Sequence, residues 1–261
     1  MGNNLKAYCL KRKIPYILFS PGKSKDVAAW LKKLSPDLLV IFSMSQLLKK
    51  NIISIPRLGV INLHPSYLPF YRGPNPDFWQ YYDMDVNPGV TVHFVDEGED
   101  TGDIIHQERI PVPLGIKSPE RLDKLIGDAG VRLLTQSIRE IDAGSAKPVR
   151  QPQASPTPRA RNILPEEHRN LIDWENWPIE RIWNLLRGTE LWLNAIEQPS
   201  GLHRGQRWSV GGFELVKPPS AVELGSIYRD GRRRYVACKG GRIEISVRFS
   251  LRKMFLGLLK R

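Results

Sequence analysis

The stretch "GVINLHPSYLPFYRGPNP" (residues 59–76) begins as an apolar β-type run and ends in a proline-rich segment. His64 precedes Pro65, and a following proline pushes the backbone into the extended region. Asn62 and His64 are two positions apart on an extended segment, so their side chains project to the same side. Together an amide and an imidazole can stabilise an oxyanion and move a proton, which makes them candidate catalytic residues. The alternative is a turn in which both side chains only satisfy backbone groups.

A second stretch, "GVTVHFVDEGEDTGD" (residues 89–103), predicts a half-covered strand and then a loop rich in acids. That loop, residues 96–103, holds five acidic residues and two glycines. Open α/β sheets bind ligands in the crevice beyond their strand ends, so one carboxylate here is a candidate partner for His64. The alternatives are an ordinary acidic turn and a cation-binding loop. No two of the five histidines have the spacing of a ligand pair, which disfavours a metal site.

Strand-like and helix-like segments alternate up to about residue 145, which predicts an α/β fold with a parallel-rich sheet. Serine precedes or opens each of the two clearest helices, so Ser24 and Ser118 are candidate N-caps, and Gly144 is a candidate helix end. The expected strands are residues 14–20, 36–43, 59–64, 89–96 and 103–113, and the expected helices are residues 24–35 and 118–144.

The composition changes after residue 147, where five prolines between 148 and 165 predict a linker. A helix is expected at 178–188, and the short β-type runs after it predict a small barrel-like domain. The last residues, 248–261, have a basic amphipathic pattern that suits packing on this domain or contact with a membrane surface. The expected division is a catalytic domain (1–147), a Pro-rich linker (148–170) and a C-terminal helix with a β-rich domain (171–261).

Composition predicts a cytoplasmic protein of 261 residues, because no window is long and apolar enough for a membrane span and Cys9 and Cys238 match no oxidised scaffold. The formal net charge is +12. Lys and Arg number 11 against 2 acids in residues 1–57, 9 against 14 in 58–150, and 19 against 11 in 151–261. Basic ends around an acidic middle suit a polyanionic partner, and the alternative is a basic surface that only aids solubility.

The two stretches together, "GVINLHPSYLPFYRG" and "GVTVHFVDEGEDTGDII", resemble the formyltransferase family that uses 10-formyltetrahydrofolate. The resemblance spans residues 6–145 and continues more weakly into the β-rich end. It implies a Rossmann-like formyltransferase domain and places the family's catalytic Asn, His and Asp on Asn62, His64 and Asp100. The implied reaction is direct attack of an acceptor amine on the formyl carbon. Asn62 and protonated His64 would stabilise the oxyanion, Asp100 would orient His64 and help accept the amine proton, and no metal is needed.

The resemblance also implies an apolar slot that binds the folate and two residues that lie beside the acceptor. Arg72 and Gly73 are the expected acceptor-side residues, with Arg72 either binding a phosphate or bracing its loop. The apolar members of the folate slot can equally be plain core. The expected folate-binding residues are Met44, Leu47, Leu48, Val95, Asp96, Glu97 and Gly98.

Two features depart from the family pattern. The family's domain opens with a strand, a glycine-containing loop, a helix and a second strand, and this chain starts about thirty residues later, so its sheet is expected to be incomplete at the N-terminus. In "PNPDFWQYY" (74–82) bulky residues stand where the family's tRNA enzyme has small ones. These aromatic side chains either reshape the acceptor side or form helix core.

Three functions follow from the resemblance. The first is formyl transfer to initiator methionyl-tRNA, which suits the second domain and the basic ends. The second is formyl transfer to a nucleotide-linked amino sugar, which suits the altered segment 74–82. The third is a catalytically inactive folate- or nucleic-acid-binding remnant, which folate would stabilise without release of tetrahydrofolate.

Overall fold

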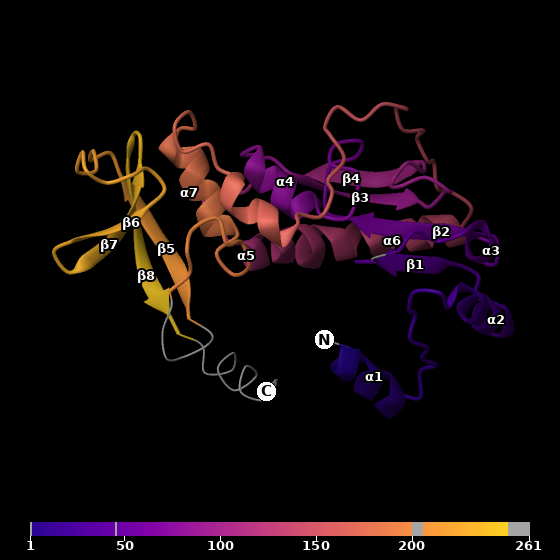
Figure 1. The fold of residues 1–261 in the computed structure, drawn as a ribbon. Coiled ribbons are helices and arrows are strands. Elements are labelled where there is room, and N and C mark those ends of the chain that lie inside the picture. The colour runs from indigo at the N-terminus through magenta and orange to yellow at the C-terminus, as the bar shows by residue number, and fades with distance from the viewer. Residues whose placement is uncertain (1, 45, 200–205, 250–261) are drawn as a thin grey trace.

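The computed structural model describes residues 2–44, 46–199 and 206–249. Two sheets lie at opposite ends of the molecule, with helices α4 and α7 between them (Figure 1). Within the described residues, no helix combines the length and apolar character that crossing a membrane requires. The predicted amphipathic tail lies almost entirely outside the described residues.

The first sheet is mixed. Its order is β1-β2-β3-β4, with β1 and β2 parallel and both other pairs antiparallel. The expected parallel character therefore holds only for β1 and β2. Strand β3 returns beside β2 after α4, and β3 and β4 form a hairpin around the acidic loop. The strands are β1 (Leu39–Phe42), β2 (Val60–His64), β3 (Gly89–Phe94) and β4 (Ile104–Arg109), and α4 is Pro76–Tyr82.

The expected strand at residues 14–20 is wrong, since this segment pairs with no described strand. Its apolar side chains instead pack on a cluster formed by α2, α3 and the first two strands, as Ile17 and Phe19 show. Burial of side chains thus accounts for the apolar run without a ladder of backbone hydrogen bonds. The N-terminal helices are α1 (Gly2–Lys11), α2 (Ser24–Leu34) and α3 (Lys50–Ile53).

Neither candidate serine caps its helix. Lys23 and Lys117 hold the cap positions, and each serine is the first helical residue. The hydroxyl of Ser24 is buried without a hydrogen-bond partner among the described residues, whereas that of Ser118 donates to the carboxylate of Asp77. For Ser118, a tertiary contact therefore takes the place of the expected cap.

The predicted long helix forms, but it changes its winding in the middle. It consists of α5 (Ser118–Leu122), a π-helical segment η1 (Asp123–Gly130) and α6 (Val131–Asp142), and it ends before Gly144, which has φ +64°. Leu133 and Ile141 of α6 pack on the first sheet, along which the helix runs in Figure 1. π-Helical segments are rare in proteins, and those that occur are often at functional sites. This one reaches the cavity described below.

The C-terminal part begins with a 3₁₀ turn and helix α7, followed by an antiparallel sheet of order β5-β8-β7-β6. The β-rich domain is confirmed. Strands β5 and β6 lie at opposite edges and do not pair with each other, so the described strands form an open sheet and not a closed barrel. The elements are η2 (Pro165–Asn170), α7 (Ile179–Gly188), β5 (Arg207–Glu214), β6 (Ile227–Asp230), β7 (Arg233–Cys238) and β8 (Gly241–Arg248).

The aromatic residues of α4 build the core between the two parts of the chain. Phe78 and Tyr81 are almost completely buried against Ile182 and Leu185 of α7. Trp79 and Tyr82 pack against the same cluster and are partly buried. The aromatics in "PNPDFWQYY" are therefore helix core, which is one of the two alternatives the sequence left open.

Candidate functional site

Strand β2 carries two of the predicted catalytic side chains to one end of the first sheet. His64 is the last residue of the strand, and Asn62 lies two residues before it on the same side. In the register with β3, Asn62 is opposite His93 and His64 is opposite Thr91. This pairing brings a second imidazole beside Asn62.

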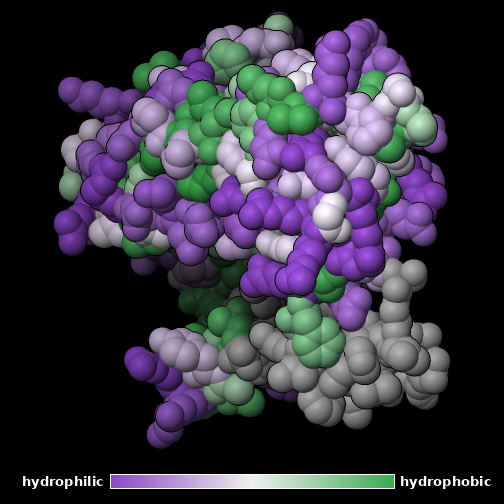
Figure 2. Space-filling model, turned by 90° about the vertical axis from the view of Figure 1, so that its left-hand side faces the viewer, coloured by the Kyte–Doolittle hydropathy of each residue, from purple (hydrophilic) through white to green (hydrophobic). Residues whose placement is uncertain are grey.

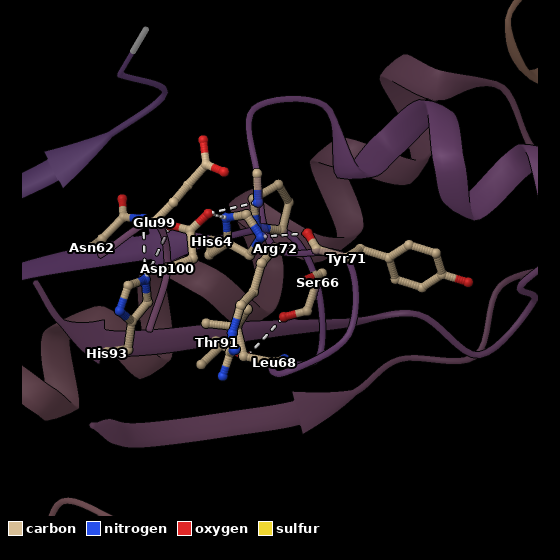
Figure 3. Close-up of polar contacts among 12 residues, drawn as sticks. Asn62, His64, Ser66, Leu68, Tyr71, Arg72, Thr91, His93, Glu99 and Asp100 are labelled. Atoms are coloured by element: carbon tan, nitrogen blue, oxygen red, sulfur yellow. Dashed lines mark hydrogen bonds and ion pairs between the residues drawn. The ribbon is translucent and has the colours of Figure 1, made fainter. Parts of the chain in front are cut away.

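Asp100 comes from the loop after β3 and joins the two predicted side chains (Figure 3). One carboxylate oxygen, Oδ2, lies 3.7 Å from Nδ1 of His64 and accepts the Gly73 N–H at 2.9 Å. The other, Oδ1, accepts from the Asn62 amide at 3.3 Å. The structure thus brings Asn62 and His64 together around the carboxylate of Asp100.

His93 belongs to the same cluster, and sequence reasoning missed it. Its Nδ1 lies 2.7 Å from the carbonyl oxygen of Phe94, and its Nε2 lies 3.2 Å from the amide nitrogen of Asn62 and 3.6 Å from Asp100. A carbonyl only accepts, so Nδ1 carries the hydrogen, and in neutral His93 the Nε2 lone pair accepts from Asn62. The alternation in "GVTVHFVD" indicated a shared face, but only the strand register shows which residue of β2 His93 meets.

Burial and charge set the protonation of the pair. His64 is buried, its Nε2–H donates to the Tyr71 carbonyl at 3.1 Å, and burial lowers the pKa of His64 although Asp100 raises it. Burial by itself would raise the pKa of Asp100, but the two imidazoles and the Gly73 N–H outweigh it and hold that pKa well below its ordinary value. Near neutral pH, Asp100 is ionised and His64 is neutral, with the Nδ1 lone pair facing the carboxylate and ready to take a proton.

A cavity of about 730 Å³ opens beside this cluster. Its size lies within the range of small-molecule sites. Met44, Leu47 and Leu48 line one wall, and Leu48 also belongs to a core cluster. The π-helical segment and the start of α4 line other parts. The lining includes Asn62, His64, Gly73, His93, Val95, Asp96, Gly98, Asp100, Asp77, Ile126, Gly127, Arg159 and Asn162.

Two predicted residues lie away from the cavity. Glu97 is not among its lining residues and forms an exposed ion pair with Lys50 at 3.3 Å. Arg72 is buried, and its guanidinium donates to the Gln151 side chain and to the carbonyls of Pro152 and Gln153. The structure therefore places Arg72 as a brace on its loop, outside the residues that line the cavity.

Gly73, next to Arg72, does line the cavity. Its φ is +122°, and a Cβ built on it would lie 2.9 Å from the carbonyl oxygen of Ala160. A side chain at this position would push the linker away and disturb the N–H that binds Asp100. Glycine is required here by conformation and by space.

An ionised carboxylate, two imidazoles and an amide beside a cavity with one apolar wall define an α/β enzyme site suited to proton transfer on a ligand with an apolar body. Two family models match the chain: formyl transferase over residues 18–138, and formyl transferase C-terminal domain over residues 165–253. The chain belongs to the formyltransferase family. It is thus a transferase of formyl groups, and the formyl donor of this family is 10-formyltetrahydrofolate.

Individual relatives agree. The methionyl-tRNA formyltransferase of Moorella thermoacetica is 31% identical over 93% of this chain and 75% of its own. That of Syntrophus aciditrophicus is 38% identical over 82% of this chain and 67% of its own. Among solved structures, the sugar 3N-formyl transferase WlaRD has a TM-score of 0.62 at 16% identity, covering 95% of this chain and 82% of that chain. HypX from Aquifex aeolicus has a TM-score of 0.63 at 16% identity, covering 93% of this chain and 43% of that chain. These two structures share the fold.

The lowered pKa of His64 predicts how the enzyme depends on pH. If neutral His64 takes a proton in the reaction, kcat/KM should stay constant down to a pH below 6.5, the ordinary imidazole value. Asp100→Asn should move this acid limb lower still, because the carboxylate raises the pKa of His64. A pH–rate profile checks the acid limb, and a limb at or above 6.5 would contradict the prediction.

The lowered pKa of His64 also affects stability. The folded state should lose stability as pH falls below 6.5, since the unfolded chain binds the extra proton first.

Proposed function

We propose that this protein formylates the amino group of methionyl-tRNA, with 10-formyltetrahydrofolate as donor. The observation that carries the proposal is the convergence of Asn62, His64 and Asp100 on one cavity in a chain whose relatives at 31–38% identity are methionyl-tRNA formyltransferases. We further propose that the protein acts in the cytoplasm and that its chain divides at the linker 148–170.

Charge on the C-terminal sheet supports a polyanionic acceptor. The β6–β7 hairpin carries four arginines, and no ion pair among the described residues involves Arg229 or Arg232. Figure 2 looks onto the side of the molecule where this sheet lies in Figure 1, and hydrophilic residues cover much of it. Unpaired guanidinium groups suit the phosphates of an RNA backbone.

In the proposed reaction the acceptor amine attacks the formyl carbon, and negative charge develops on the formyl oxygen. The Asn62 amide donates to this oxygen, and His64 stabilises the charge once it has taken the amine proton and become an imidazolium. In the described state both amide hydrogens of Asn62 are directed at His93 and Asp100, so one of these bonds gives way when the formyl oxygen binds. The amine proton passes to His64 beside Asp100, and this pair then delivers the proton to the folate nitrogen as the bond between that nitrogen and the formyl carbon breaks.

For the folate, the apolar wall of Met44, Leu47 and Leu48 supplies a surface for the ring system. Val95 packs on the same core cluster as Met44, and Asp96 and Gly98 beside it add polar groups to the lining. The residues present therefore fit a ligand with a flat apolar body and polar edges. Glu97 is left out of this assignment because its side chain pairs with Lys50.

The nucleotide-linked amino sugar loses part of its support. That reading depended on aromatic residues of segment 74–82 reshaping the acceptor side, and Phe78 and Tyr81 are directed into the core against α7. The sugar formyltransferases among the solved structures share the fold at 16% identity and say nothing of the acceptor here. The sugar remains an outcome of the experiment.

The experiment incubates the purified chain with 10-formyltetrahydrofolate and either initiator methionyl-tRNA or a nucleotide-linked amino sugar. Release of tetrahydrofolate and formylation of the amine are measured together. Turnover with the tRNA supports the proposal, and turnover with the sugar alone overturns it. Thermal stabilisation by folate without release of tetrahydrofolate from either mixture would identify the chain as a binding protein without catalysis.

A further inference from the structure

Gln151 is a buried residue of the Pro-rich linker whose amide joins the two loops of the site. Its Oε1 accepts from Nε and Nη2 of Arg72 at 3.2 and 2.8 Å. Its Nε2 donates to the carbonyls of Asp100 at 3.0 Å and Gly102 at 2.6 Å. One side chain thus ties the segment after β2 to the loop after β3.

The orientation of this amide is fixed by its partners. A guanidinium only donates hydrogen bonds and a backbone carbonyl only accepts them. Gln151 must therefore direct its oxygen toward Arg72 and its NH₂ toward Asp100 and Gly102. The role of Arg72 in the site is accordingly indirect, since it holds Gln151 in the orientation in which its NH₂ donates to the acidic loop.

The conformation of the acidic loop requires contacts that hold it in place. Asp100 has φ +55°, in the left-handed region that non-glycine residues seldom adopt. Residues in sparsely populated conformations are strained and persist only where surrounding contacts hold them. Space around the loop is also restricted, because a Cβ at Gly102 would lie 2.0 Å from the carbonyl oxygen of Phe94. The backbone of Asp100 is held by Gln151 while its carboxylate is held by Gly73 and Asn62.

We propose that Gln151 is a positioning residue, which keeps the Asp100 carboxylate within reach of His64 and Asn62 and so makes the linker part of the catalytic site. The inference rests on the proposed function for the roles of these three side chains. The competing explanation is that Gln151 only attaches the linker to the domain. Attachment alone would affect stability and leave the chemistry at Asp100 unchanged.

The test uses two substitutions in the full chain. Gln151→Met removes every polar contact, and Gln151→Glu keeps an acceptor for Arg72 but has no N–H for the two carbonyls. Both should lower kcat at least about tenfold, with the KM for the folate within about twofold, because a small displacement of a reacting group costs far more rate than binding. In an Asp100→Asn background neither substitution should lower kcat further.

A readout without turnover separates this inference from the proposed function. Asp100 raises the pKa of His64, so Gln151→Met should lower the His64 pKa followed by NMR titration. If no acceptor is formylated by the unmodified protein, the proposed function fails while this titration still decides the role of Gln151. If Gln151→Met does not fold, Gln151→Glu, which retains a partner for Arg72, decides the kcat comparison.

Arg161→Gln is the matched linker control. Arg161 pairs with Glu167 within the linker and contacts neither loop of the site, so its substitution should leave kcat and the His64 pKa unchanged. An unchanged kcat in both Gln151 variants overturns the proposal. So does an equal loss of kcat with and without Asp100, or a His64 pKa that does not move.

Discussion

His64→Ala and Asn62→Ala are each expected to lower turnover at least about 100-fold, because one positioned donor at a developing oxyanion is worth about 2.7–4 kcal/mol. Both side chains lie at the end of β2 and line the cavity beside Asp100. The KM for the folate should change much less, since the wall proposed to hold its apolar body is formed by other residues, Met44, Leu47 and Leu48. Single-turnover kinetics with saturating folate measure the chemical step directly.

His106→Ala is the matched control. His106 forms a comparable imidazole–carboxylate pair with Glu140 at 2.8 Å, and neither residue lines the cavity. Its loss should leave turnover unchanged. Near-normal turnover in His64→Ala or in Asn62→Ala would remove the substituted residue from the chemistry. An equal loss in His106→Ala would attribute the effect to general destabilisation.

Phe78→Ala should cost about 3–5 kcal/mol of the free energy of unfolding, as expected for removal of a fully buried aromatic side chain. Phe78 has 0% exposure and contacts the cluster that joins α4 to α7. Because this cluster unites both parts of the chain, unfolding should remain a single transition at a lower urea concentration.

Phe42→Ala is the comparison variant for stability, since Phe42 is 53% exposed. Its cost should be a small fraction of that at Phe78. Equal costs at the two positions would contradict the assignment of Phe78 to the core. Two separate transitions in the unmodified protein would show that the two parts unfold independently.

Local pattern was sufficient for much of the fold. Apolar alternation and helical periodicity located β1 to β4, α2, α7 and the long helix, because those signals depend on neighbours in sequence. The prediction of a strand at 14–20 was wrong for the same reason, since an apolar run indicates burial and does not specify a strand partner. Ser24 and Ser118 failed as caps because tertiary contacts, or their absence, determined where each hydroxyl lies.

The site followed the same division. Asn62 and His64 could be paired from the sequence because a strand places alternate residues on one side. The family resemblance singled out Asp100, but no spacing rule brings a loop residue to within 3.7 Å of an imidazole 36 positions earlier. His93 and Gln151 carried no comparable signal, since strand register and the path of the linker decide their contacts.

The amino-acid sequence by itself determined the family, the alternation of strands and helices and the pair on β2, all of which follow from short-range periodicity and from motifs. Only the tertiary structure decided that Arg72 faces the linker, that the aromatics of α4 fill the core, and that His93 and Gln151 contact Asn62 and Asp100. Those contacts join residues tens of positions apart, and they depend on how the elements pack and not on the order in which the chain presents them.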